Sequence, residues 1–315
     1  MPSNREDLVF LKKNFPNKLY FFYIKLTNRC NLNCSICSQT ADSKKEIGIS
    51  LNEIEQGIQK VISDVVELAF SGGEPFVRYD DLVYLFQKYS IQVPGKTSIF
   101  TNGTISIKDF NHFINSKGEK AFFRISIDGI EKDHDEIRGK GRYQQTINFI
   151  NELEKHKFPF MIQSVLDESY LENDGEKLIN FYNSFKNYKF LTRHDCTPPR
   201  ICGRFATQEH YEHYLKNVER YLEIFAKYDI NHHICGYCPL REEKHIDVYN
   251  EICLDEFGYI TPICLTGHDN FFPYNEYSYE KYFQYLNNYK NIIDMSKIPK
   301  YICPLKFNDK GMTLQ

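Results

Sequence analysis

Short apolar runs rich in β-branched and aromatic residues alternate with longer amphipathic stretches along the first two thirds of the chain. The short runs are typical of buried strands, and the longer stretches are typical of helices that cover a sheet. The pattern predicts six strands, at Leu19–Thr27, Val66–Ser71, Lys96–Thr101, Ala121–Asp128, Phe160–Leu166 and Tyr188–Asp195. It predicts helices at about 50–64, 80–90, 107–116, 144–156, 173–186 and 207–228, the first opened by a reciprocal cap between Ser50 and Glu53.

This alternation predicts β/α units and therefore a parallel sheet. Six such strands joined by right-handed crossovers can form an open doubly wound sheet or an incomplete barrel of the eight-stranded kind. Both architectures place their chemistry at the carboxyl ends of the strands. We therefore look for functional residues directly after each predicted strand.

The alternation of short apolar runs and amphipathic stretches ends near residue 230. Asp247–Cys253 and Tyr259–Cys264 flank a turn at Gly258, as the strands of a β-hairpin do. The stretch Phe271–Lys290 is crowded with Tyr and Phe, which predicts a helix packed onto the rest of the fold. We predict an α/β chain with an N-terminal segment at 1–18, an incomplete (β/α)6 TIM-like barrel at 19–205, and a helical linker plus a small α+β domain at 206–315.

Charge and hydropathy exclude several classes of protein. The 315 residues contain 39 Lys+Arg and 42 Asp+Glu, a net charge of −3, with no long run of like charges, so nucleic acid and acidic membranes are not expected partners. No apolar stretch approaches the roughly 18 to 20 residues that span a bilayer. The first twenty positions carry charges where a signal peptide needs an apolar core, so we expect a cytoplasmic protein.

Ten cysteines in a reducing compartment are better interpreted as metal ligands or redox groups than as disulfides. Cys30, Cys34 and Cys37 have the spacing C-x3-C-x2-C and follow the strand that ends at Thr27. Three thiolates on one loop can hold three corners of a 4Fe–4S cluster and leave the fourth iron open. A closed zinc site and unligated core cysteines are the alternatives.

A second motif, Gly72-Gly73-Glu74-Pro75, follows the second strand. Adjacent glycines let the backbone approach a ligand closely, Glu74 can accept a hydrogen bond from a cationic amine, and Pro75 stiffens the turn. Together with the cysteine triplet, this motif resembles the radical S-adenosylmethionine (SAM) superfamily. The resemblance implies that the methionine end of SAM is held by Gly72–Pro75 and chelates the open iron. It also implies that one electron cleaves SAM to a 5′-deoxyadenosyl radical, which abstracts a hydrogen atom from the substrate.

Further motifs end the third and fourth strands, Thr101-Asn102-Gly103 and Ser126-Ile127-Asp128-Gly129, and His134-Asp135 and Arg138-Gly139 follow as in peptide-modifying members of the superfamily. The resemblance implies that Asn102 and Ser126 meet the ribose or the methionine carboxylate of SAM and that Arg138 meets a carboxylate. An ordinary ion pair is the alternative for Arg138. The full set of residues predicted to surround SAM adds Asp128, Gln163 and Ile36, the last at a position where the family often has an aromatic residue.

The segment Cys253–Cys264 resembles the hairpin of the twitch and SPASM extensions of radical SAM enzymes. The resemblance implies a second, auxiliary 4Fe–4S cluster, although one residue more than usual separates Gly258 from Cys264. The predicted ligands are Cys235, Cys238, Cys264 and Cys303, with Cys253 in reserve. The alternatives are a zinc site with the same cysteines and a set of scattered reduced thiols. Five cysteines after the barrel are too few for the two auxiliary clusters of a full SPASM extension, which favours the shorter twitch form.

Cys202 follows the sixth strand and is expected over the barrel mouth. It is a candidate hydrogen-atom donor to a substrate radical, and an inert buried thiol is the alternative. The leading function is the modification of a ribosomally made peptide by a thioether, a carbon–carbon crosslink or epimerisation, with a flavodoxin- or ferredoxin-type electron donor. A radical SAM dehydrogenase or modifier of a small molecule such as an aminosugar is the second hypothesis. A zinc-stabilised binding protein is the third.

Overall fold

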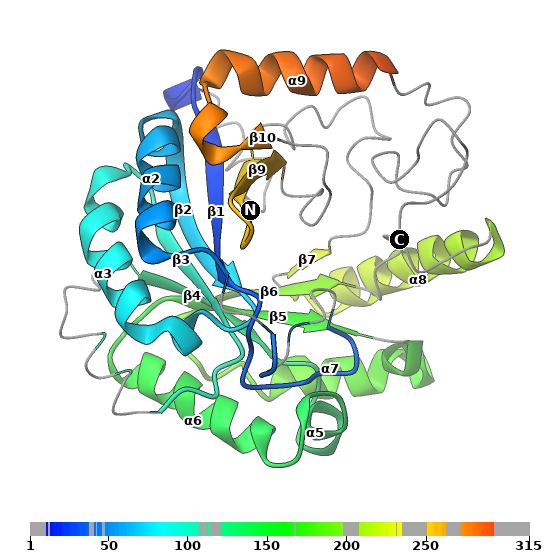
Figure 1. Ribbon diagram of the computed structural model, residues 1–315. Coiled ribbons are helices and arrows are strands. Elements are labelled where there is room, and N and C mark those ends of the chain that lie inside the picture. The colour runs from blue at the N-terminus through cyan, green and yellow to red at the C-terminus, as the bar shows by residue number, and fades with distance from the viewer. Residues whose placement is uncertain are drawn as a thin grey trace.

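The part of the chain that the structure describes is organised by one sheet, in which ten strands are assigned (Figure 1). The computed structural model describes residues 11, 13–37, 41, 43–45, 48–106, 110, 113, 121–166, 168–197, 208–230, 232–234, 251–262 and 272–292. The strand order is β10-β9-β8-β1-β2-β3-β4-β5-β6-β7. The strands are β1 Leu19–Thr27, β2 Val65–Gly72, β3 Thr97–Thr101, β4 Ala121–Ser126, β5 Phe160–Val165, β6 Leu191–Thr197, β7 His232–Ile234, β8 Glu251–Leu254, β9 Tyr259–Pro262 and β10 Phe272–Pro273.

Strands β1 to β7 run parallel, which confirms the predicted α/β class and all six predicted strands. The prediction of β1 agrees to the residue, whereas β6 begins at Leu191 instead of Tyr188. The reason is a bend at Lys189 and Phe190, whose amides donate to the Glu154 carboxylate. The sheet curves with its helices on the outside, as in an incomplete barrel (Figure 1).

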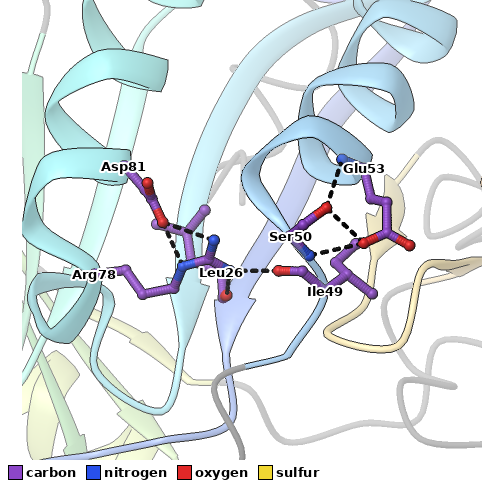
Figure 2. A network of polar contacts seen from close by, with 6 residues as sticks. All are labelled: Leu26, Ile49, Ser50, Glu53, Arg78 and Asp81. Carbon is purple, nitrogen blue, oxygen red and sulfur yellow. Dashed lines mark hydrogen bonds and ion pairs between the residues drawn. The ribbon is translucent and has the colours of Figure 1, made fainter.

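The helices that follow the strands cover the sheet. They are α2 Leu51–Val61, α3 Tyr79–Tyr89, α5 Lys132–Arg138, α6 Arg142–Lys155, α7 Glu176–Asn183, α8 Gln208–Lys227 and α9 Tyr279–Ile292. The predicted cap of α2 is confirmed, since the Glu53 amide donates to Ser50 Oγ and the Ser50 amide donates to Glu53 Oε2 (Figure 2). Of the helix predicted at 107–116 the structure describes Phe110 and Phe113, and both side chains are fully buried.

Both faces of β1 are buried, which explains its nearly continuous run of apolar residues. Phe22, Ile24 and Leu26 belong to the large core beneath the helices. Phe21 and Tyr23 instead pack in a smaller cluster with Ala69, Phe100 and Cys253. The barrel interior is therefore filled by side chains at the level of this cluster.

The predicted hairpin around Gly258 is present and continues the same sheet. Strand β8 runs antiparallel to β9 and parallel to β1, with Cys253 opposite Tyr23. The aromatic stretch after it packs as predicted, because Tyr282 of α9 is fully buried and its hydroxyl donates to the Glu251 carbonyl at 2.9 Å. A domain boundary near 206–230 remains a prediction.

Candidate active site

The cysteine triplet lies in the loop after β1. Cys30 is buried, Cys34 and Cys37 are half-buried, and the three side chains share one small cluster with Leu32 and Ala41. The Cys37 amide donates to the Cys34 carbonyl at 3.2 Å, so a tight turn joins the last two cysteines. The loop follows directly on a strand whose nine residues are all buried, which gives it a rigid base.

Burial sets the protonation of these thiols. The pKa of Cys30 is raised to about 11, mainly by burial and also by the Glu74 carboxylate and the two other thiols. The Leu32 amide, which donates to Cys30 Sγ at 3.4 Å, opposes the shift. Burial also raises the pKa of Cys34, which the nearby Arg138 cation opposes. Iron binding must therefore displace protons from these thiols, because only a thiolate ligates the metal.

The two glycines after β2 let their loop lie against the backbone that leads to Cys30. The Gly73 amide donates to the Thr27 carbonyl at 2.7 Å, and the Glu74 amide donates to the Arg29 carbonyl at 3.0 Å. A Cβ on Gly72 would lie 2.2 Å from the Thr27 oxygen, and one on Gly73 would lie 2.3 Å from the Arg29 oxygen. Gly72 also has a φ of +132°, which L side chains rarely adopt. The close neighbour of these glycines is thus the chain itself.

Glu74 ties the loop after β2 to the loop after β3. Its carboxylate is almost fully buried and accepts hydrogen bonds from the Asn102 amide at 2.8 Å, the Thr101 hydroxyl at 3.0 Å and the Phe76 amide at 3.3 Å. Burial raises the pKa of Glu74 to about 7, although these three hydrogen bonds favour its charged form. Since the carboxylate already has three donors from the chain, its first effect is to fix the two loops.

Arg78 fixes the same region from the outer side (Figure 2). It is the last residue of the 3-10 helix Pro75–Arg78. Its Nη1 donates to the carbonyls of Leu26 at 2.8 Å and Ile49 at 2.7 Å, and its Nε donates to Asp81 Oδ2 at 2.7 Å. One nearly buried guanidinium therefore joins the end of β1, the start of α2 and the start of α3.

Asn102 connects the loop after β3 to the cysteine loop. Its Nδ2 donates to Asn31 Oδ1 at 2.8 Å and lies 3.8 Å from Cys30 Sγ, and its Oδ1 accepts from the amide and the hydroxyl of Thr104. Asn31 Nδ2 in turn donates to Thr104 Oγ1 at 2.8 Å. No sequence motif assigns a role to Asn31 or Thr104. The signal that could have found them is their position beside Cys30 and beside the Asn102-Gly103 pair.

The motif residues after β4 form a second network. Arg138 Nε donates to Asp128 Oδ2 at 2.5 Å, and Asp128 Oδ1 accepts from the Val165 amide at 2.7 Å. The Asp128 amide donates to Nδ1 of His134, which is fully buried, and burial lowers the pKa of His134 to about 4. The side chains of Asp128 and Arg138 therefore hold each other and brace the loop between β4 and α5.

The remaining predicted residues are placed as follows. Ser126 and Gln163 are half-buried and lie opposite each other on β4 and β5, and Ile36 is half-buried between two of the cysteines. Cys253 is fully buried in β8 beside Phe21 and Tyr23, and burial raises its pKa to about 12. Five predicted residues lie outside the part of the chain that the structure describes: Cys202, Cys235, Cys238, Cys264 and Cys303.

The cysteine loop suits a 4Fe–4S cluster in its donor set. It supplies three soft thiol ligands, and both the Leu32 amide and the Asn102 amide group point donors at Cys30 Sγ. Within the described ranges, no three His, Cys, Asp or Glu side chains converge as ligands of a single ion. A cubane cluster presents a separate iron to each thiolate, so its ligands do not need to meet at one point.

Known proteins share this part of the chain. A family model described as the radical SAM superfamily matches residues 24–182, the range that contains the cysteine loop, both glycines, Asn102 and the Asp128–Arg138 pair. Among the helices of the described residues, none is long and apolar enough to cross a membrane.

Three curated relatives align with nearly half of the chain. The AdoMet-dependent heme synthase of Methanosarcina barkeri is 32% identical over 152 residues, 47% of this chain and 43% of that protein. The sporulation killing factor maturation protein SkfB of Bacillus subtilis is 27% identical over 157 residues, 46% of this chain and 35% of that protein. The antilisterial bacteriocin subtilosin biosynthesis protein AlbA, also of Bacillus subtilis, is 28% identical over 148 residues, 45% of this chain and 32% of that protein. The chain thus aligns with less than half the length of each relative.

Two solved structures share the fold over most of the chain. Streptococcus suis SuiB bound to S-adenosylmethionine superposes with a TM-score of 0.63 and 17% identity, covering 88% of this chain and 68% of that one. The structure of anSMEcpe with bound AdoMet and the Cp18Cys peptide gives a TM-score of 0.63 and 18% identity, covering 94% of this chain and 92% of that one. At such identities the similarity establishes the architecture.

Proposed function

The chain belongs to the radical SAM superfamily and is an enzyme, and from that premise we propose that it modifies a ribosomally made peptide. The modification is a thioether, a carbon–carbon crosslink or an epimerised residue. The two Bacillus subtilis relatives support this substrate class, since one is named for maturation of the sporulation killing factor and the other for subtilosin biosynthesis. Membership of an enzyme superfamily sets aside the zinc-stabilised binding protein.

In this proposal Cys30, Cys34 and Cys37 hold a 4Fe–4S cluster, and the backbone of Gly72–Pro75 binds the methionine end of SAM. When bound, the cluster would relay an electron from an external donor and SAM would supply the hydrogen-abstracting group. The chain's own part is placement: Glu74 and Asn102 fix the loops at the ends of β1, β2 and β3 relative to one another. The residues assigned to contact SAM from the other loops are Asn102, Ser126, Asp128, Arg138, Gln163 and Ile36.

The C-terminal cysteines complete the proposal. Cys235, Cys238, Cys264 and Cys303 hold an auxiliary 4Fe–4S cluster, with Cys253 in reserve, and Cys202 donates a hydrogen atom to the substrate radical. The hydrogen atom from Cys202 would serve epimerisation, in which the substrate radical is reduced. In crosslink or thioether formation the auxiliary cluster would instead take up the electron that the substrate radical loses, or it would anchor the substrate. A flavodoxin- or ferredoxin-type protein supplies the electron for SAM cleavage.

One observation carries the proposal: hydrogen bonds unite three loops around three thiols at the carboxyl edge of the sheet, in a chain that matches the superfamily model. The test is anaerobic reconstitution with iron and sulfide, followed by incubation with SAM, a reductant and deuterated candidate substrates. The candidates are short peptides encoded beside the gene and a panel of aminosugars. Deuterium in 5′-deoxyadenosine with a peptide supports the proposal, label only with a small molecule supports the second hypothesis, and the absence of any SAM cleavage contradicts both.

Iron content tests the two clusters separately. The reconstituted protein should hold about eight iron atoms per chain, and the triple variant Cys30→Ala, Cys34→Ala, Cys37→Ala should hold about four and form no 5′-deoxyadenosine. Only four iron atoms per chain in the wild type would contradict the proposed auxiliary cluster. Cys253→Ala is the matched control, because full iron content in that variant shows that the reserve ligand is not used.

A further inference from the structure

A cleft of about 350 Å³ separates the cysteine loop from the turn between α5 and α6. One wall contains Asn31, Asn33 and Ser35, and the other contains Arg138, Lys140 and Arg142. The Ser35 amide donates to the Ile137 carbonyl at 3.2 Å, so the two walls are joined beside the cleft. Cys34 is the chain neighbour of Asn33 and Ser35 in the first wall, so the cleft lies directly beside the cysteine loop.

The lining of the cleft is basic. It contains three cations and one carboxylate, that of Glu136. Arg138 is held by Asp128, whereas Lys140 is exposed and Arg142 Nη1 donates to the neutral Gln145 side chain. Within the described residues, neither Lys140 nor Arg142 forms an ion pair with a carboxylate. Two cations beside the cysteine loop are therefore available to a partner.

We propose that this cleft docks a small acidic electron-carrier protein, an inference that rests on the proposed cluster at Cys30, Cys34 and Cys37. Each reductive cleavage of SAM requires one electron from outside the enzyme, and the reduced carrier becomes oxidised by one electron as it delivers it. Delivery is fastest where the carrier approaches the thiols most closely, and at this cleft the two neighbours of Cys34, Asn33 and Ser35, are exposed. Exposed rim cations of this kind steer acidic proteins to an interface.

The shape of the cleft favours a protein partner over a small anion. Lys140 is exposed on the rim and is not enclosed, whereas an anion site needs buried donors that converge on one point. Ile137 lies half-buried in the lining and offers an apolar contact between the polar walls. An apolar centre within a charged, hydrated rim is the usual anatomy of a transient protein interface.

The experiment compares two reductants of the reconstituted enzyme. Reduced flavodoxin is the acidic protein probe, and photoreduced deazaflavin is a small neutral donor that needs no docking. The variant is Lys140→Glu with Arg142→Glu, and the control is Lys60→Glu on the exposed face of α2. The readout is the rate of cluster reduction, measured by the loss of visible absorbance over a range of flavodoxin and salt concentrations.

We expect the second-order rate with flavodoxin to fall about tenfold or more in the double variant and to lose most of its salt dependence. The control should stay within about twofold of the wild type, and deazaflavin should reduce all three proteins at equal rates. Lys140→Gln with Arg142→Gln, which removes charge without reversing it, should give an intermediate rate. This neutral pair keeps the test valid if the charge-reversed variant does not fold.

An unchanged flavodoxin rate in the double variant would overturn the docking site. So would binding of inorganic phosphate to the wild type but not to the variant, with the flavodoxin rate unaffected, because the cleft would then be an anion site. A wild type that deazaflavin cannot reduce, or that holds no iron, would instead contradict the proposed function. The two failures are therefore distinguishable.

Discussion

The carboxylate of Glu74 accepts a hydrogen bond from the backbone amide of Asn102 at 2.8 Å, and both residues are buried. Through this bond the loop after β2 supports the loop after β3. The Asn102 side chain then reaches Asn31, which adjoins the first cysteine. Three loops that are far apart in the sequence therefore act as one support for the thiols, and a change in any of them should affect iron binding.

Asn102→Ala tests this support. The change removes the donor to Asn31 and to Cys30 Sγ and the acceptor used by Thr104. The cysteine loop then keeps only the bond from Asn31 to Thr104 as its side-chain link to the loop after β3. Loss of such outer contacts typically lowers metal affinity about 10- to 100-fold. We expect a comparable fall in iron retention when the anaerobic protein is challenged with a chelator.

Asn148→Ala is the matched control for this prediction. Asn148 is an exposed asparagine of α6 that accepts a hydrogen bond from Gln144. Its replacement should leave iron retention unchanged. Equal retention in the two variants would show that Asn102 does not support the cysteine loop.

Gly73→Ala tests the contact between the first two loops. The new Cβ would lie 2.3 Å from the Arg29 carbonyl oxygen, which is backbone and cannot move without displacing the chain before Cys30. Overpacking of this kind typically costs about 1 to 3 kcal/mol. We expect a loss of that size in the free energy of unfolding, measured with urea, together with weakened iron binding.

Gly57→Ala is the comparison. A Cβ there would meet the end of the flexible Leu254 side chain at 2.6 Å, and alanine is favoured over glycine inside a helix by about 1 kcal/mol. Its stability should change less than that of Gly73→Ala, and its iron binding should not change. A Gly73→Ala protein that binds iron as tightly as the wild type would show that the glycine motif does not support the cysteine loop.

The local parts of the site could be predicted from the sequence. The cysteine triplet, the glycine pair and Asn102 each follow a strand whose apolar pattern is unambiguous, and the carboxyl ends of parallel strands meet at one edge. Their convergence was therefore expected. What each side chain contacts there was not, since Glu74 and Asn102 are 28 positions apart and no periodic pattern encodes a hydrogen bond between loops.

The placement of the C-terminal hairpin was also beyond prediction. Its two strands and the turn at Gly258 were visible in the alternation of apolar residues. The partner of its first strand was not, because β8 and β1 are separated by more than two hundred positions and an apolar strand does not specify its neighbour. The close approach of Gly72 and Gly73 to the backbone of Thr27 and Arg29 could not be predicted for the same reason, because it joins segments that are distant in the sequence. Their contact with SAM stays a prediction.

Arg78→Met tests the network in Figure 2. The change leaves the carbonyls of Leu26 and Ile49 and the carboxylate of Asp81 without their donor. Breaking a buried ionic contact from one side typically costs about 3 to 5 kcal/mol, and the lower end applies because Asp81 is partly exposed. We expect a loss of about 3 kcal/mol in the free energy of unfolding.

Lys88→Met provides the contrast, since the Lys88–Glu55 pair joins two helices at a more exposed position. Solvent screens exposed pairs of this kind, so the free energy of unfolding should fall clearly less in Lys88→Met than in Arg78→Met. Urea unfolding of both variants at one pH compares their losses in the free energy of unfolding. Equal losses would mean that Arg78 acts as an ordinary surface cation.

The last prediction concerns His134 and acid stability. Burial lowers its pKa from 6.5 to about 4, so the folded protein holds the ring neutral while the unfolded chain binds a proton below pH 6.5. The contribution of His134 to stability is therefore complete above pH 6.5 and is lost as the pH falls towards 4, by about 2 kcal/mol at pH 5. His134→Asn keeps an acceptor for the Asp128 amide but cannot titrate, so its unfolding free energy should fall less between pH 7.5 and pH 5 than that of the wild type. Burial of His194 adds a slope of the same sign and about the same size to both proteins, because its pKa is lowered to about 3. Identical slopes in His134→Asn and the wild type would show that the ring of His134 is not held neutral by the fold.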